Sequence, residues 1–130
     1  NDVSGRDMCG LEIKSLLGLA KGKDKDGWNQ MGPYLVTPDE WDFRDEHQMI
    51  VRVNGEVWGG GPTTSVSSDP AEALSYLSRH ETLYPGDVIG FGTVGTGTGA
   101  DIGRWPQAGD VVEMEVEGIG VLRSRFVRPG

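Results

Sequence analysis

The sequence predicts a fold that is mainly β with a minor helical contribution. Glycine supplies 21 of the 130 residues, turn dipeptides recur along the chain, and short apolar alternations separate these turns. This combination is typical of β-structure, because successive side chains of a strand point to opposite faces and tight turns favour glycine. A chain of this length fits one domain with a substantial hydrophobic core. We therefore expect residues 1–130 to form a single domain.

The clearest predicted element is a β-hairpin centred on Asn54-Gly55. Residues 51–53 alternate apolar and charged side chains before this turn, and residues 56–58 resume the strand after it. Asn and Gly tolerate the positive φ angles that a two-residue hairpin turn requires. The pattern therefore predicts two adjacent antiparallel strands.

Two later segments, residues 85–89 and 108–112, look like copies of one device in which a turn feeds an apolar strand. In the second copy, the strand would place its apolar side chains on one face and its carboxylates on the other. The apolar set is Val112, Met114 and Val116, and the acidic set is Glu113, Glu115 and Glu117. We expect the acidic set to be a solvent-facing row. A glycine turn at residues 118–120 then leads to a last strand at residues 121–127.

One helix is well marked by its first residues. Asp69 can accept hydrogen bonds from the free amides of a first turn, and Pro70 suits the first helical position. Glu72 occupies the place where a capping box has a carboxylate. Leu74 and Leu77 then continue an apolar stripe at helical spacing.

The remaining segments carry weaker signals. Residues 11–20 have apolar side chains at helical spacing, although Gly18 interrupts them, and we expect a second helix there. Residues 59–65 and 93–99 are predicted to be loops, because glycine at such density loses too much conformational entropy in regular elements. His47 and His80 lie in polar surroundings and are predicted to be surface residues.

Composition excludes several classes of function. The formal net charge is -8, whereas proteins that bind nucleic acids present clusters of Lys and Arg to the phosphates. No apolar run approaches the roughly 20 residues that a membrane-spanning helix needs. Cys9 is the only cysteine, so neither an internal disulfide nor a cysteine-based zinc site can form. We expect a cytoplasmic protein with no nucleic-acid or membrane partner.

The opening residues 1–7, Asn-Asp-Val-Ser-Gly-Arg-Asp, and the later stretch at residues 22–27 resemble motifs of the fumarylacetoacetate hydrolase family. The resemblance covers nearly the whole chain, and it continues through residues 31–37, 53–56, 83–89, 92–93, 108–112 and 117–123. It implies a mixed β-roll or barrel-like sheet and a homodimer. It also implies that residues 1–130 are the C-terminal portion of a longer catalytic domain, because the family's two metal-binding glutamates and its lid residues are not in this chain.

The resemblance implies a hydrolase that depends on a divalent metal and cleaves a C–C bond in an acylpyruvate or β-diketo acid. The metal would be Mg²⁺ or Mn²⁺, with Ca²⁺ as a further candidate. Asp2 matches the family's metal-binding aspartate, and hard cations of this kind prefer carboxylate oxygens. Arg6 could orient a carboxylate or support the ligand shell. Lys23 matches the lysine that stabilises developing oxyanion charge.

The same resemblance assigns Gly92 and Thr93, at an expected strand end, to binding of the substrate's carboxylate. A loop that is rich in free amides suits an anion. Cys9 and Gly27 differ from the residues that the family often has at these positions, so the substrate can differ from the namesake's.

Other functions remain open at the level of sequence. The same scaffold also resembles that of oxaloacetate decarboxylases, tautomerases and lyases. A non-catalytic β-domain that serves assembly is an alternative of a different class. The G-x-G-x-x-G pattern at residues 90–95 argues little for a dinucleotide site, because more Thr and Gly follow it where a helix should begin.

Overall fold

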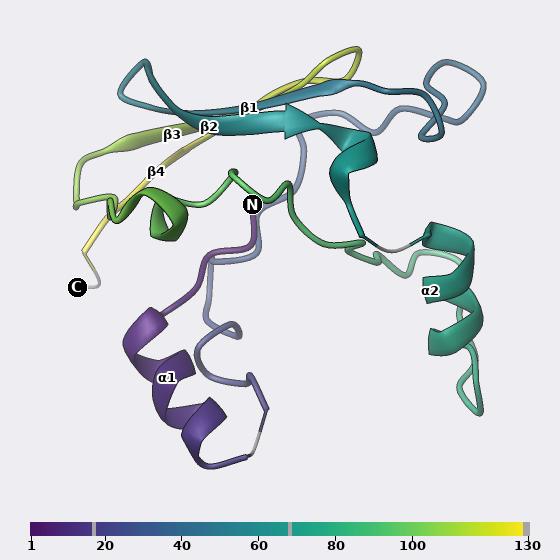
Figure 1. The fold of residues 1–130 in the computed structure, drawn as a ribbon, viewed down its shortest axis with the longest axis horizontal. Coiled ribbons are helices and arrows are strands. Elements are labelled where there is room, and N and C mark those ends of the chain that lie inside the picture. The colour runs from purple at the N-terminus through teal and green to yellow at the C-terminus, as the bar shows by residue number, and fades with distance from the viewer. Residues whose placement is uncertain (17, 68, 129–130) are drawn as a thin grey trace. The chain divides into compact units, whose positions relative to one another are not determined.

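The computed structural model describes residues 1–16, 18–67 and 69–128, and it is drawn in Figure 1. The chain divides into two compact units, residues 1–35 and residues 36–130. The single domain predicted from the sequence stays a prediction. Within the described ranges, no helix is both long enough and apolar enough to cross a membrane.

The first unit contains the helix α1, Arg6–Lys14. Asp7 lies in its first turn and Lys14 in its last turn, where a negative and a positive charge respectively favour the helix dipole. The predicted bounds of 11–20 were wrong, because Ser15 ends the helix and both Leu16 and Gly18 have positive φ angles, of 57° and 74°. Leu17, which belongs to the predicted stripe, lies outside the described residues.

Gly10 is a helical glycine without a close neighbour, and this makes it a site for stabilisation. A Cβ atom added to Gly10 would meet no heavy atom within 4 Å. We expect Gly10→Ala to raise the free energy of unfolding by about 0.5–1 kcal/mol, because alanine loses less backbone entropy than glycine in a helix. Urea unfolding monitored by circular dichroism would measure the change. A lower midpoint for the variant would contradict this account of α1.

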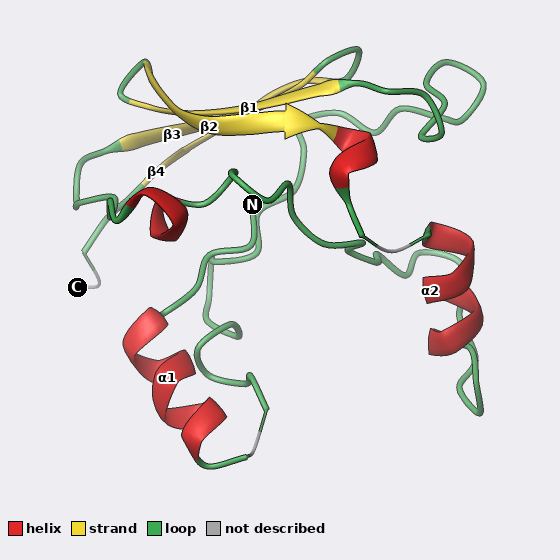
Figure 2. Ribbon diagram, viewed as in Figure 1, coloured by secondary structure: helices red, strands yellow, loops and turns green. Residues whose placement is uncertain are grey.

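The second unit is built on a four-stranded antiparallel sheet with the strand order β2-β1-β3-β4 (Figure 2). The strands are β1 (Gln48–Val53), β2 (Glu56–Pro62), β3 (Val111–Val116) and β4 (Gly120–Arg125). With the helices α1 and α2 (Pro70–Leu77), this confirms the mainly β fold class. The sheet is open, with β2 and β4 at its edges. Short 3-10 helices occur at Thr63–Ser65 and Gly99–Ile102.

The hairpin predicted at Asn54-Gly55 is confirmed as the turn between β1 and β2. Asn54 and Gly55 have φ angles of 51° and 82°, and Val53 pairs with Glu56 across the turn. The helix α2 is also confirmed, because the side chain of Asp69 accepts a hydrogen bond of 2.6 Å from the amide of Ala71. Both signals are local in sequence and do not depend on distant neighbours.

Of the two predicted turn-and-strand devices, only the second forms a strand. In both, the aspartate accepts a hydrogen bond from the amide three residues earlier, at 2.8 Å for Asp87 and 2.7 Å for Asp110. Asp110 also accepts a hydrogen bond of 2.8 Å from the side-chain amide of Asn54. The side-chain oxygen of Asn54 in turn accepts a hydrogen bond of 3.0 Å from the amide of Val111. These bonds hold β3 against β1. The strand predicted at residues 85–89 was wrong, because Val88 is 71% exposed and no described strand pairs with this segment.

The glycine-rich stretch at residues 59–65 was predicted to be a loop, and this was wrong for its first half. Gly59, Gly60 and Gly61 belong to β2. A Cβ on Gly59 would overlap the carbonyl oxygen of Thr96, and a Cβ on Gly61 would lie 2.9 Å from Cγ1 of Val94. Glycine occurs in this strand because another segment approaches its backbone closely.

The two faces of β3 follow the predicted alternation. Val112, which is 5% exposed, pairs in register with the equally buried Val53 of β1. On the other face, Glu115 forms an ion pair of 2.5 Å with Arg52, and Glu113 lies 3.6 Å from Arg123. Two members of the predicted solvent-facing row, Glu113 and Glu115, are therefore half-buried and paired with arginines from the neighbouring strands, whereas Glu117 is exposed as predicted.

His47 is half-buried, whereas its polar neighbours predicted a surface residue. Its ring stacks on Trp41 with 4.2 Å between the ring centroids, and its Nε2 lies 2.8 Å from the carbonyl oxygen of Asp42. Trp41 in turn donates a hydrogen bond of 2.8 Å to the carbonyl oxygen of Glu117. This cluster packs the connection before β1 against the turn after β3. His80 is exposed, as predicted.

Candidate active site

Asp2 is held beside a later segment of the first unit by backbone pairing. The backbone of Asp2 forms an isolated antiparallel bridge with that of Asn29. On either side, the amide of Gln30 donates to the carbonyl oxygen of Asn1 at 3.0 Å, and the amide of Val3 donates to that of Trp28 at 3.3 Å. The position of Asp2 is thus fixed by main-chain hydrogen bonds, and its side chain is free to face a partner.

That partner is Lys23. Its Nζ lies 2.6 Å from Oδ2 of Asp2, and the two side chains are 31% and 58% exposed. The structure therefore brings together two of the residues that the sequence singled out, although they are 21 positions apart. The pair presents a fixed cation beside a carboxylate that remains accessible to solvent.

Two neighbouring lysines have different surroundings. Lys21 lies 3.6 Å from Asp24 in a highly exposed ion pair. The Nζ of Lys25 lies 4.4 Å from the ring centroid of Trp28. Among the lysines of this stretch, the contact with Asp2 belongs to Lys23, the residue that the Gly-Lys motif had indicated.

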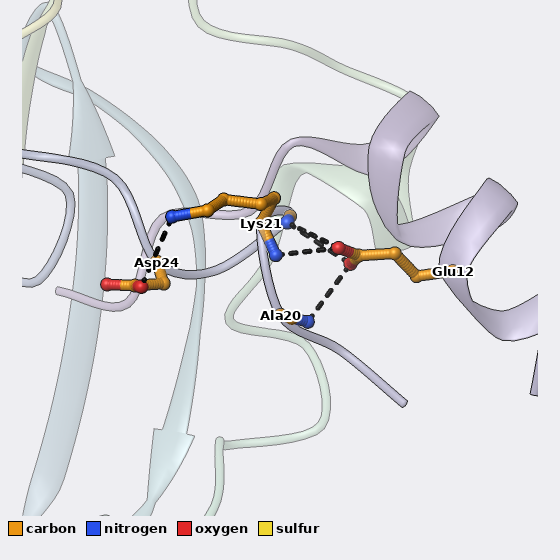
Figure 3. A network of polar contacts seen from close by, with 5 residues as sticks. Glu12, Ala20, Lys21 and Asp24 are labelled. Atoms are coloured by element: carbon orange, nitrogen blue, oxygen red, sulfur yellow. Dashed lines mark hydrogen bonds and ion pairs between the residues drawn. The ribbon is translucent and has the colours of Figure 1, made fainter. Parts of the chain in front are cut away.

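The loop before Lys23 is attached to α1 by Glu12, which sequence reasoning missed. The carboxylate of Glu12 accepts hydrogen bonds from three successive amides, those of Ala20, Lys21 and Gly22 (Figure 3). Burial raises the pKa of Glu12, but these amides and the charge of Lys21 outweigh it and hold the pKa below its ordinary value. No local signal identifies such a residue, because a helical glutamate is most often solvated.

Arg6 is the first residue of α1, and its side chain is exposed. It forms no ion pair within 4.0 Å of another residue in the described part of the chain. Its predicted role in orienting a carboxylate therefore stays a prediction.

Gly92 and Thr93 belong to the second unit and lie in an irregular segment, whereas a strand end had been expected there. Gly92 has a φ angle of 108°, which favours glycine. Thr93 is exposed, while the next residue, Val94, is 5% exposed and anchors the segment. The hydroxyl of Thr96 donates a hydrogen bond of 2.6 Å to the carbonyl oxygen of Gly60, which ties the loop to β2.

An open groove of about 390 Å³ lies elsewhere in the second unit, and its lining includes Trp58, Trp105 and Arg104. Arg104 forms two hydrogen bonds with Glu56, at 2.6 and 2.8 Å, and its guanidinium lies 4.2 Å from the ring centroid of Trp58. The hydrogen bonds between Glu56 and Arg104 lower the pKa of Glu56 and raise the pKa of Arg104. Arg104 and Glu56 neutralise each other, so neither charge is left unpaired in the groove. Their contact joins β2 to the segment after Gly99–Ile102.

The described residues do not form a complete divalent metal site. Across residues 1–16, 18–67 and 69–128, no group of three or more His, Cys, Asp or Glu side chains is placed to hold a metal ion. Asp2 offers one carboxylate, and the ammonium of Lys23 already contacts it. One carboxylate seldom holds Mg²⁺ against water. The described residues by themselves therefore do not fit a resident metal.

Comparison with known proteins agrees with the sequence motifs. Residues 1–127 match the family described as fumarylacetoacetate (FAA) hydrolase, C-terminal. A 2,4-didehydro-3-deoxy-L-rhamnonate hydrolase from Sphingomonas sp. (strain SKA58) is 38% identical over 111 residues, which are 82% of this chain and 38% of that protein.

Two solved structures share the fold. A fumarylacetoacetate hydrolase from the psychrophilic Exiguobacterium antarcticum superimposes with a TM-score of 0.83 at 35% identity, covering 99% of this chain and 45% of that one. A 5-carboxymethyl-2-hydroxymuconate delta-isomerase from Mycobacterium smegmatis gives a TM-score of 0.81 at 33% identity, covering 100% and 47%. The chain thus spans less than half the length of these relatives. Because the family match extends over nearly all of its residues, the chain belongs to the fumarylacetoacetate hydrolase family.

Proposed function

We propose that this chain is the C-terminal part of a hydrolase that cleaves a C–C bond in an acylpyruvate or related β-diketo acid. The observation that carries the proposal is the 2.6 Å contact between Lys23 and Asp2. It supports the proposal because Lys23 lies beside the carboxylate that the family resemblance implies to be a metal ligand. The named relatives are two hydrolases and one isomerase, and each name specifies a small carboxylic acid as the substrate.

Lys23 would act on charge that develops during the reaction. In the hydrolysis, water adds its oxygen to the acyl carbonyl carbon, the adjacent C–C bond breaks, and the released carbon takes up a proton. The products are a carboxylic acid and pyruvate. A preorganised ammonium close to the attacked carbonyl stabilises the oxyanion that forms there. Lys23 suits this role because Asp2 and the preceding loop fix its position.

The other predicted residues complete the proposal. Asp2 would supply one oxygen ligand to Mg²⁺ or Mn²⁺, with Ca²⁺ as a further candidate, and the remaining ligands would come from a preceding part of the same polypeptide. Arg6 would orient a carboxylate near this site. Gly92 and Thr93 would hold the carboxylate of the keto acid through exposed amide and hydroxyl groups. The proposal includes a homodimer and a cytoplasmic location.

An isomerase is the second candidate, and a specific observation favours it. The delta-isomerase from Mycobacterium smegmatis is nearly as similar to this chain as the named hydrolase from Exiguobacterium antarcticum. An isomerase shifts a proton between carbon atoms without adding water, so mass spectrometry of the product separates the two reactions. Decarboxylation or lyase chemistry would show as loss of CO₂ or as cleavage without uptake of water.

Metal titration of the complete polypeptide tests the proposed role of Asp2. We expect saturable binding of Mg²⁺ or Mn²⁺ by calorimetry, and a loss of at least about tenfold in affinity for Asp2→Ala, since even outer-shell changes cost 10- to 100-fold. Asp24→Ala is the matched control, because this exposed aspartate in the same unit pairs with Lys21. Absent binding, or equal affinity in the Asp2→Ala variant and the wild type, would rule out the metal role and favour a non-catalytic domain.

A further inference from the structure

We propose that Glu12 is a positioning residue that sets the place of Lys23 by clamping the loop in front of it. This inference rests on the proposed function of Lys23 and names a residue that the family motifs did not indicate. Glu12 does not contact Asp2 or Lys23 directly in the described hydrogen bonds and ion pairs. It acts through the backbone of residues 20–22.

The hydrogen bonds of Glu12 define three consecutive peptide groups. Oε1 accepts from the amides of Lys21 at 2.6 Å and Gly22 at 3.3 Å. Oε2 accepts from those of Ala20 at 3.1 Å and Gly22 at 3.1 Å. Bonds from a carboxylate to amides are stronger than those between neutral groups. The main chain up to the residue before Lys23 is therefore attached to α1.

The opposite side of Gly22 is attached as well. Its carbonyl oxygen accepts a hydrogen bond of 2.8 Å from the amide of Gly5, the residue that precedes α1. A Cβ on Gly22 would overlap Sγ of the buried Cys9 and lie 2.9 Å from the amide nitrogen of Cys9. Gly22 is thus pressed against the helix and held on both of its peptide groups. Since Lys23 follows directly, the starting point of its side chain is fixed relative to α1.

This geometry explains why Lys23 rather than Lys21 contacts Asp2. The amide of Lys21 donates to Glu12, while its side chain pairs with Asp24 in solvent (Figure 3). The amide of Lys23 instead closes a turn onto the carbonyl oxygen of Ala20 at 2.9 Å. The clamp and this turn together direct the lysine two positions later toward Asp2. Without the carboxylate of Glu12, three amides would lose their shared acceptor and the loop would lose this orientation.

The reactivity of individual lysines tests the clamp without any substrate. In the complete polypeptide, an amine-acylating reagent followed by peptide mass spectrometry gives a rate for each lysine. We expect Lys23, which is 31% exposed, to react more slowly than Lys21, which is 70% exposed. Glu12→Gln should raise the rate of Lys23 toward that of Lys21, because one acceptor oxygen is replaced by a donor. Glu81→Gln, an exposed glutamate in the other unit, should change neither rate. An unchanged rate at Lys23 would overturn the proposal.

Turnover measurements separate positioning from a merely structural role. We expect Glu12→Gln to lower kcat by about 10- to 100-fold with little change in KM, since a small misplacement of a reacting group has effects of this size. In a Lys23→Met background, the same substitution should have almost no further effect, because the group that it positions is already gone. Additive losses in the double variant would overturn the proposal. Glu12→Asp, which keeps the charge but shortens the side chain, is the second variant and should lower kcat as well.

The lysine reactivities and the turnover measurements together distinguish the failure of this inference from the failure of the proposed function. If no keto acid is turned over but Lys23 becomes more reactive in Glu12→Gln, the clamp is supported and the proposed hydrolase activity is wrong. If the enzyme is active and the lysine rates do not change, the clamp is wrong and the proposed activity stands.

Discussion

Replacing Lys23 by methionine should lower kcat for acylpyruvate hydrolysis by about 10²- to 10³-fold, the loss typical of removing one group that stabilises an oxyanion. Methionine keeps a long unbranched side chain and removes the charge. The ion pair with Asp2 is partly exposed, and surface ion pairs of this kind contribute only about 0–1 kcal/mol to stability. We therefore expect a large change in turnover with a small change in the free energy of unfolding. Steady-state kinetics and urea unfolding of the same preparation measure both.

Lys21→Met is the matched control for this prediction. Lys21 lies two residues away, has the same charge, and forms an exposed pair with Asp24 at 3.6 Å. If net positive charge in the loop were sufficient, both variants would lose activity to a similar extent. If the 2.6 Å contact with Asp2 marks the reacting cation, only the Lys23→Met variant loses activity. Full activity in Lys23→Met would remove the main support for the proposed hydrolase mechanism.

The elements that the sequence predicted correctly are those with local causes. The turn at Asn54-Gly55 depends on backbone angles that these two residues adopt readily, and the start of α2 depends on Asp69 and Pro70. The segment at residues 85–89 has the same turn chemistry as residues 108–112, and its predicted strand was wrong. The difference lies in Asn54, which is distant in sequence and holds only the second segment. Local pattern alone could not reveal this contact.

The candidate site shows the same division between local and distant causes. The motifs were sufficient to predict Asp2 and Lys23 as site residues, and the structure adds that the two side chains form an ion pair. Glu12 could not be selected, because its role depends on a loop folding back against the last turns of α1. The loop predicted at the glycines of β2 was wrong for a related reason. Their small size serves an approach by residues 94–97, which lie more than 30 positions later and leave no mark near the glycines themselves.

That close approach leads to the second large effect. Gly59→Ala should destabilise the protein by about 3 kcal/mol, at the upper end of the usual cost of overpacking. The new Cβ would overlap the carbonyl oxygen of Thr96 and lie 2.9 Å from its carbonyl carbon. Both are backbone atoms, so no side chain can rotate away, and either β2 or the loop must shift. The hydrogen bond from Thr96 to Gly60 is 2.6 Å long and would be strained by the same displacement.

Two glycines nearby make the argument quantitative, because they differ in what a Cβ would meet. At Gly61 the nearest atom is Cγ1 of Val94, 2.9 Å away, and at Gly95 a Cβ meets nothing within 4 Å. Val94 is buried and has limited freedom to rotate, so Gly61→Ala should have an intermediate effect. Gly95→Ala should stay within about 0.5 kcal/mol of the wild type. Chemical denaturation of the three variants should therefore rank them Gly59, Gly61, Gly95 in decreasing loss of stability. Equal losses would mean that backbone entropy, and not the approach of the loop, explains why β2 contains glycine.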